Sequence, residues 1–159
     1  MPTRTLLAVA VLLGALLPPC AAAGQGQAQA PWFGTWKLDL MKSAYDPGPP
    51  PFRRATLKVE PSTRQSSDGV NVTYDMIRPR GGITHLEWTG RFDGKDYPLQ
   101  GIEDYAVTIA YHQLDSRTFD VVQKVDGAPV VTARMTISAD GQTLTLASPG
   151  STAVYDLSR

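Results

Sequence analysis

From residue 34 onward, apolar residues alternate with polar ones over many short stretches of the chain. In residues 34–40, Trp36 and Leu38 would share one face of an extended backbone, while Lys37 and Asp39 would share the other. The same period of two recurs in residues 54–60, 70–76, 85–88, 105–111, 119–123, 131–137, 144–146 and 153–157. No stretch has convincing helical spacing, so the pattern predicts about nine or ten β-strands.

The breaks between these stretches carry turn-forming residues. Four Asp-Gly pairs occur, at Asp68-Gly69, Asp93-Gly94, Asp126-Gly127 and Asp140-Gly141. Asp-Gly supplies the positive φ angles of tight hairpin turns, and it therefore predicts antiparallel strands with short connections. Residues 45–52 differ, because they contain four prolines. Proline lacks the backbone N–H that helices and sheet ladders need, so an extended surface loop is expected there.

So many strands, without a helix to cover them, need another way to bury one apolar face. We expect an all-β fold, an antiparallel up-and-down β-barrel of about 8–10 strands, because a closed barrel has one interior and no exposed edge. The alternative is a two-sheet β-sandwich, which also buries one face of each strand. Residues 32–159 are expected to form this single domain.

The first 31 residues have a different composition and are not expected to belong to the barrel. Arg4 precedes an uninterrupted apolar stretch at residues 6–17, and prolines and alanines follow it. This order is typical of a cleaved signal peptide, here residues 1–23, with a flexible leader at 24–31. The protein is therefore expected to be secreted or periplasmic, without a membrane span after cleavage. Two alternatives are an uncleaved N-terminal membrane anchor and a lipid anchor on Cys20.

Composition after that cleavage narrows the range of functions. The remaining 136 residues (159 − 23) suffice for one domain with one hydrophobic core. The chain's single cysteine, Cys20, is lost, so neither a disulfide framework nor a thiolate site is expected. Loss of Arg4 leaves 14 basic residues (15 − 1) against 15 acidic ones, a net charge of −1, and no nucleic-acid partner is expected. Two short arginine groups, at 53–54 and 78–80, are interpreted as solvated surface charge, and the oligomeric state is left open.

Several motifs resemble those of known proteins. Gly34-Thr35-Trp36 resembles the Gly-x-Trp signature of the calycin superfamily, which includes lipocalins and fatty-acid-binding proteins. A wider set resembles a group of small secreted bacterial proteins with a lipocalin-like barrel and no assigned activity. It comprises Gly34-Thr35-Trp36-Lys37-Leu38-Asp39, Lys42-Ser43, Tyr45, Pro47-Gly48-Pro49, Asp93-Gly94-Lys95-Asp96-Tyr97-Pro98 and Ser138-Ala139-Asp140-Gly141-Gln142-Thr143-Leu144-Thr145.

Two departures from fatty-acid-binding proteins bear on the ligand. The proline-rich stretch at 45–52 occupies the position of their helical lid and cannot be helical. Ala153 stands where their carboxylate-binding arginine would fall, two residues before Tyr155. A fatty acid bound in their manner is therefore not expected.

By resemblance to lipocalins, Trp36 is expected to plug the closed end of the barrel beneath an arginine of a late strand. Arg134 is the only arginine within such a strand, so it is the expected partner. A guanidinium over an indole face contributes about 0.5–2 kcal/mol. The alternative is that Arg134 faces solvent, because Ala133 and Met135 occupy the opposite face of the same strand.

The inward faces of the expected strands are rich in aromatic residues. The candidate ligand-binding residues are Trp36, Tyr74, Trp88, Tyr105, Tyr111, Phe119 and Tyr155. A barrel of this size either fills with its own side chains or keeps a pocket for one small apolar ligand, and the sequence leaves both open. We expect a non-catalytic binding protein for a small apolar or aromatic ligand. The alternatives are a cell-envelope structural or interaction module with a filled barrel, and a cofactor-free enzyme acting in the barrel.

Catalytic and metal-binding motifs do not occur in the sequence. His85 and His112 fall on the outward faces of their strands, and two histidines without a third ligand make a poor metal site. His85 and Glu87 share a face, but no nucleophile pattern accompanies them. No phosphate loop, dinucleotide fingerprint or serine-hydrolase elbow is found, so neither a cofactor nor a metal is expected.

Overall fold

The computed structural model describes residues 30–62 and 68–158, and every regular element in this part of the chain is a β-strand. The strands are β1 (Gly34–Leu38), β2 (Ala44–Tyr45), β3 (Arg54–Ser62), β4 (Gly69–Ile77), β5 (Ile83–Gly90), β6 (Tyr97–Gln100), β7 (Val107–Gln113), β8 (Thr118–Val125), β9 (Ala128–Ile137), β10 (Thr143–Ser148) and β11 (Ser151–Ser158). Within these ranges no helix is long and apolar enough to cross a membrane. The expected signal peptide at 1–23, with Cys20, and all of the leader before Ala30 lie outside the described residues.

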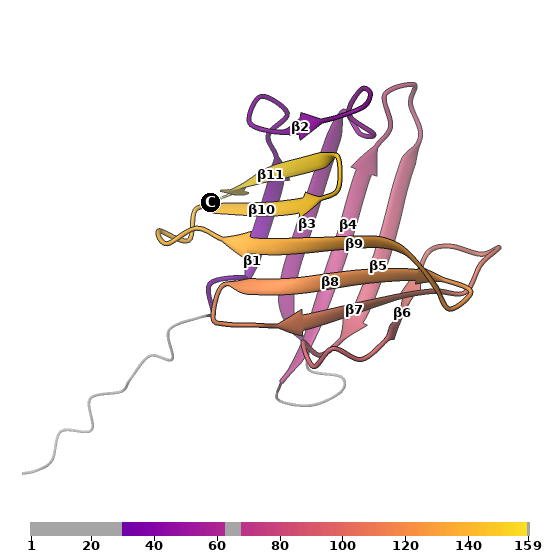
Figure 1. Cartoon of the computed structure of the whole chain (residues 1–159), viewed down its shortest axis with the longest axis vertical. Coiled ribbons are helices and arrows are strands. Elements are labelled where there is room, and N and C mark those ends of the chain that lie inside the picture. Colours follow the sequence, from indigo (N-terminus) through magenta and orange to yellow (C-terminus); the bar gives the residue numbers. More distant parts are fainter. Residues whose placement is uncertain (1–29, 63–67, 159) are drawn as a thin grey trace, which may run out of the picture.

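The strands form one continuous sheet that closes on itself (Figure 1). Neighbours run antiparallel in the order β1-β3-β4-β5-β6-β7-β8-β9-β10-β11, and β1 pairs with both β3 and β11. The short strand β2 pairs with β11 outside that circle. The fold is therefore a closed ten-strand up-and-down barrel with one outer strand, which confirms the predicted barrel and is consistent with a calycin-like fold. The two-sheet sandwich is not formed.

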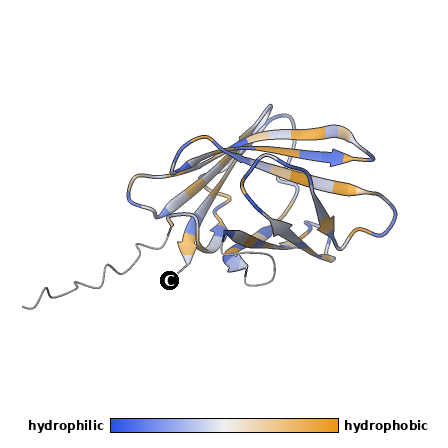
Figure 2. Ribbon diagram, turned by 90° about the horizontal axis from the view of Figure 1, so that it is seen from below, coloured by the Kyte–Doolittle hydropathy of each residue, from blue (hydrophilic) through white to orange (hydrophobic). Residues whose placement is uncertain are grey.

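The alternation of the sequence decides which side chains fill the barrel. On β3, Leu57 and Val59 are buried, whereas Lys58 between them is exposed. The register then places inward residues of neighbouring strands side by side, and Leu57 is the partner of Trp36 on one side and of Tyr74 on the other. Figure 2 shows hydrophobic and hydrophilic residues interleaved along the strands. One apolar face is thereby removed from water, which is the main stabilising contribution to such a fold.

One of the Asp-Gly pairs forms the tight turn that the sequence predicts. Between β8 and β9, Asp126 has a φ of 49° and Gly127 a φ of 82°, the combination found in a type I′ turn. Asp140-Gly141 instead lies in the longer β9–β10 loop, where the Gly141 N–H donates to the Ser138 carbonyl at 2.9 Å. Residues 46–53 connect β2 to β3 outside any strand, as expected from their prolines.

The prediction that Tyr105 faces the barrel interior is wrong, because its side chain is 60% exposed. The strand β7 begins only at Val107, and residues 101–106 form an irregular connection. In this connection, the Ala106 N–H donates to the Asp126 carboxylate at 3.2 Å, and the Ala106 carbonyl accepts from the Asp126 N–H at 2.9 Å. These bonds hold the connection to the β8–β9 hairpin, so Tyr105 lies before the sheet ladder and outside its alternation.

Up-and-down connectivity places alternate connections at opposite ends of the barrel. One end, which we call the open end, carries the connections 39–53, 78–82, 101–106, 126–127 and 149–150. The other, the closed end, carries the connections 91–96, 114–117 and 138–142 together with residues 30–33. The two ends differ in how their interiors are filled.

Candidate functional site

Aromatic rings fill the interior at the closed end. Trp36, Trp88 and Phe119 are at most 1% exposed. Trp32, from the segment before β1, packs edge-on against Phe119 with ring centroids 5.3 Å apart, and Phe92 packs against the same ring at 4.9 Å. Edge-to-face contacts of this kind stabilise beyond the burial of the rings themselves. This half of the barrel is a packed core.

The expected pairing of Trp36 with Arg134 is corrected by the structure. The Trp36 indole N–H donates to the backbone carbonyl of Trp32 at 3.1 Å. Arg134 lies on the outer face of β9, where its side chain is 59% exposed and donates to the Asp120 carboxylate at 2.8 and 2.9 Å. Strand alternation explains the difference, because both neighbours of Arg134 on β9 are buried.

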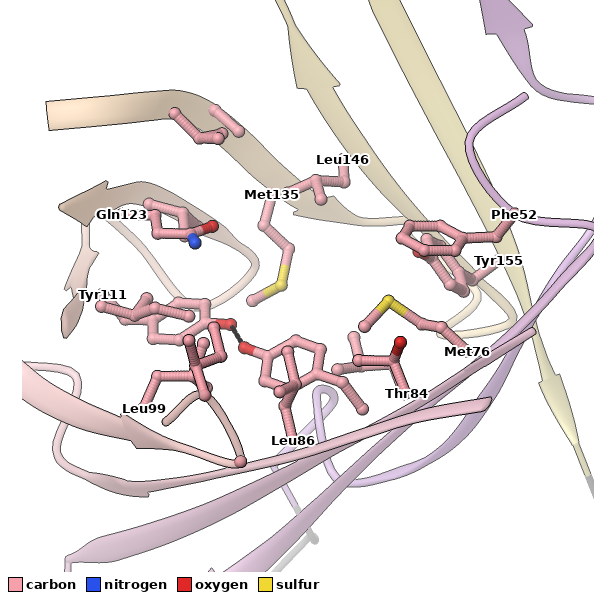
Figure 3. A pocket seen from close by; sticks show the side chains of 18 of the residues that line it. Phe52, Met76, Thr84, Leu86, Leu99, Tyr111, Gln123, Met135, Leu146 and Tyr155 are labelled. Atoms are coloured by element: carbon pink, nitrogen blue, oxygen red, sulfur yellow. Dashed lines mark hydrogen bonds between the residues drawn. The ribbon is translucent and has the colours of Figure 1, made fainter. Parts of the chain in front are cut away.

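The open half of the barrel contains a cavity of about 700 Å³ (Figure 3). Most of its wall is aliphatic or thioether surface, contributed by strands all around the barrel. These residues include Leu57, Met76, Leu86, Leu99, Ile109, Val121, Met135, Leu144 and Leu146. In Figure 3 the side chains of Met76 and Met135 both extend into the middle of the cavity. Its size and lining are typical of a site for one small molecule.

Two tyrosine hydroxyls meet on the cavity wall. Tyr74 of β4 and Tyr111 of β7 are hydrogen-bonded to each other through these hydroxyls (Figure 3). Burial raises the pKa of Tyr111 to about 12, and burial followed by the adjacent Tyr111 raises the pKa of Tyr74 well above its usual value. Both phenols are therefore protonated at neutral pH. Because one hydrogen bond uses only one of the two hydroxyl protons, the other proton is available to a bound molecule.

Three further uncharged polar side chains line the cavity, namely Tyr155 of β11, Gln123 of β8 and Thr84 of β5. In Figure 3 the Gln123 amide extends toward the middle of the cavity. Burial raises the pKa of Tyr155 to about 12, so this phenol is also uncharged near neutrality. A few neutral hydroxyl and amide groups on an apolar wall are able to orient a ligand by hydrogen bonding.

The mouth of the cavity has a different character from its interior. Arg78, in the β4–β5 connection, is the one charged residue that lines the cavity within the described ranges, and no carboxylate lines it there. Phe52 from the proline-rich loop, Ile83 of β5 and Val131 of β9 line the same region and are partly or largely exposed. The entrance is thus apolar and carries one positive charge, whereas the interior is uncharged.

The structure divides the seven aromatic candidates into three groups. Tyr74, Tyr111 and Tyr155 line the cavity, Trp36, Trp88 and Phe119 belong to the packed closed end, and Tyr105 lies on the surface. The period of two in residues 70–76, 119–123 and 131–137 places Met76, Gln123 and Met135 on inward faces, but these three residues were not among the predicted ligand-binding residues. Sequence reasoning missed Phe52 and Arg78, because both lie in connections where no period indicates a direction.

Neither histidine lines the cavity. His85 projects from the outer face of β5, with its Nδ1 2.6 Å from Asp75 and its Nε2 3.1 Å from Glu87. The hydrogen bond to Asp75, followed by the one to Glu87, raises the pKa of His85 above its usual value. His112 is exposed on β7. Across residues 30–62 and 68–158, no three potential metal ligands come together.

Comparison with known proteins gives no further information on the site. No family model matches the chain, and no curated protein or solved structure matches it. The functional interpretation therefore depends on the cavity itself.

Proposed function

We propose that the protein is an exported, lipocalin-like binding protein that holds one small apolar or aromatic molecule in its barrel without catalysing a reaction. The observation that carries the proposal is the cavity of about 700 Å³ in the open half of the barrel. A barrel that served only as a structural module would be expected to fill this space with side chains, as the closed end does. The signal-like composition of residues 1–23 supports export.

The cavity wall supplies both a driving force and an orienting element. Removing apolar surface from water contributes about 25 cal/mol per Å², and pockets of this kind bury about 70–90% of a ligand's surface. The Tyr74–Tyr111 pair, Tyr155 and Gln123 are placed to bond one or two polar atoms of such a ligand. These features favour a ligand whose buried part is uncharged and carries only a few hydrogen-bonding atoms.

The ionisable groups of the cavity support binding rather than catalysis. General acid–base catalysis works best when the pKa of the catalytic group lies near the working pH. The pKa values of Tyr111 and Tyr155, each about 12, keep both phenols protonated near neutrality.

The neutral fluorescent probe N-phenyl-1-naphthylamine tests the proposal, because its emission increases in an apolar environment. We expect saturable binding of one probe molecule per chain. Val131 lines the cavity at its mouth and is 41% exposed, so a larger side chain fits there without disturbing the core. Val131→Trp is expected to weaken binding about tenfold, equivalent to about 1.4 kcal/mol.

Thr132→Trp is the matched control, because the neighbouring position on β9 is exposed and faces away from the cavity. It should bind the probe with the affinity of the wild type. Circular dichroism and the melting temperature establish that both variants are folded. The proposal is wrong if the folded wild type does not bind the probe, or if the two tryptophan variants weaken binding equally.

A further inference from the structure

Four arginines lie at the open end of the barrel, although they form two separate groups in the sequence. Arg54 is the first residue of β3 and Arg53 immediately precedes it, and Arg78 and Arg80 lie in the β4–β5 connection. The register pairs Arg54 with Ile77, and the Arg53 N–H donates to the Ile77 carbonyl at 2.9 Å. The two groups are therefore adjacent on neighbouring strands, where the strands reach the cavity mouth.

These arginines differ from most other basic residues in having no carboxylate partner. All four are exposed, and none forms an ion pair with a carboxylate of residues 30–62 or 68–158. Ion pairs with acidic residues are formed by Lys42, Lys58, Arg91, Lys95, Lys124 and Arg134. None of these four guanidinium groups is therefore held in an ion pair with a carboxylate of the described residues.

The position of Arg78 links this charge to the cavity. Arg78 lines the cavity, as does Phe52, which immediately precedes Arg53. The connection 101–106 also lies at this end, but its lining residues are Gly101 and Ile102, and its acidic residues do not line the cavity. A molecule that leaves the cavity through the mouth therefore meets a guanidinium and no lining carboxylate.

The interior, in contrast, has nothing that would stabilise a charge. Its polar groups are phenols with raised pKa values, an amide and a hydroxyl. An anion taken into it would lose hydration without gaining an opposite charge, which is strongly unfavourable. An anionic group is stable only at the mouth, beside arginine and in contact with water.

We propose that the ligand is an amphipathic anion, whose apolar body fills the cavity and whose negatively charged head group lies at the mouth against Arg78. Arg53 and Arg80 lie in connections at the same end of the barrel and add positive charge there, whereas Arg54 is on the outer face of β3. This inference rests on the proposed binding function and specifies its ligand class and orientation. Arginine suits the role, because its planar guanidinium stays charged and donates several hydrogen bonds to an oxyanion.

Two fluorescent probes with the same aromatic body test the proposal. N-phenyl-1-naphthylamine is neutral, and 1-anilinonaphthalene-8-sulfonate carries an additional sulfonate. In Arg78→Gln, we expect the dissociation constant of the sulfonate probe to rise about three- to fivefold, as for the loss of an exposed charge pair. The dissociation constant of the neutral probe should change less than about twofold. Raising the salt concentration should weaken binding of the sulfonate probe only, because salt screens exposed charges.

Arg117→Gln is the matched control, since Arg117 is an exposed arginine in the β7–β8 connection at the closed end. It should leave both dissociation constants unchanged. Retained binding of the neutral probe shows that each variant is folded with an intact cavity. If the neutral probe binds but Arg78→Gln and salt affect the two probes alike, the head-group assignment is wrong and the binding function stands. If the neutral probe does not bind the wild type, both are wrong.

Discussion

Truncating two phenylalanines at opposite ends of the barrel measures how differently the two halves are packed. Phe119 is fully buried, with its ring centroid 5.3 Å from that of Trp32 and 4.9 Å from that of Phe92. Phe52 is half-buried at the cavity mouth. The substitution Phe→Ala removes the same atoms at both positions. A difference between the two losses in free energy of unfolding therefore reports how each side chain is surrounded.

The structure predicts that Phe119→Ala lowers the free energy of unfolding several times more than Phe52→Ala does. Burial of a phenylalanine side chain contributes about 1.5–3 kcal/mol, and each edge-on ring contact adds about 0.5–1.5 kcal/mol. Phe119→Ala is therefore expected to cost about 3–5 kcal/mol, as for other buried phenylalanines. Phe52 already borders empty space and solvent, so Phe52→Ala should cost about 1 kcal/mol or less.

Urea unfolding followed by far-ultraviolet circular dichroism is the appropriate assay, because the free energy of unfolding extrapolates linearly to water. Circular dichroism reports the sheet as a whole, whereas tryptophan emission would also respond to the lost contact with Trp32. Equal costs for the two variants, or a larger cost for Phe52→Ala, would refute the division into a packed half and a hollow half.

Three further predictions address individual contacts. The folded-state pKa of His85 lies above its ordinary value of 6.5, so its pairing with Asp75 stabilises the fold fully below that pH and less as pH rises through the folded-state pKa. The urea stabilities of the wild type and Asp75→Asn should differ most below pH 6.5 and converge at higher pH, and a constant difference would contradict this. Gly127→Ala should lower the melting temperature by about 4 °C, since Gly127 has a φ of 82° and an added Cβ meets nothing within 4 Å; an unchanged melting temperature would count against the type I′ turn. Tyr74→Phe and Tyr111→Phe should each cost about 1 kcal/mol in urea unfolding, and the double variant less than their sum. Additive costs would show that the two hydroxyls are not bonded.

The strands and their closure were predictable because one physical rule produces both. A period of two identifies inward residues such as Leu57 and Val59, and burying that single face without helices requires a closed sheet. The same rule places Arg134 outside, and it proved more reliable there than the lipocalin resemblance. The rule failed for Tyr105, because the alternation in the sequence already begins at this residue. The strand β7 and its hydrogen-bonded ladder begin only two residues later, at Val107.

The division between core and cavity was not predictable from the period. Alternation gives the face of a residue but not its depth along the barrel axis, so Trp88 and Tyr74 look equivalent in the sequence. The packed end depends on Trp32 and Phe92, which come from segments without alternation. Likewise, the convergence of Arg53 with residues near Ile77 depends on the register of β3 and β4.

Nuclear magnetic resonance of methionine methyl groups provides the most direct test of the hollow barrel. Met76 and Met135 line the cavity, whereas Met41 is 94% exposed outside it. With methyl-labelled methionine and bound N-phenyl-1-naphthylamine, we expect nuclear Overhauser contacts from the probe to the methyl groups of Met76 and Met135, and none to Met41. Contacts to Met41, or their absence at both Met76 and Met135 while the probe is bound, would contradict a ligand-sized cavity in the open half of the barrel.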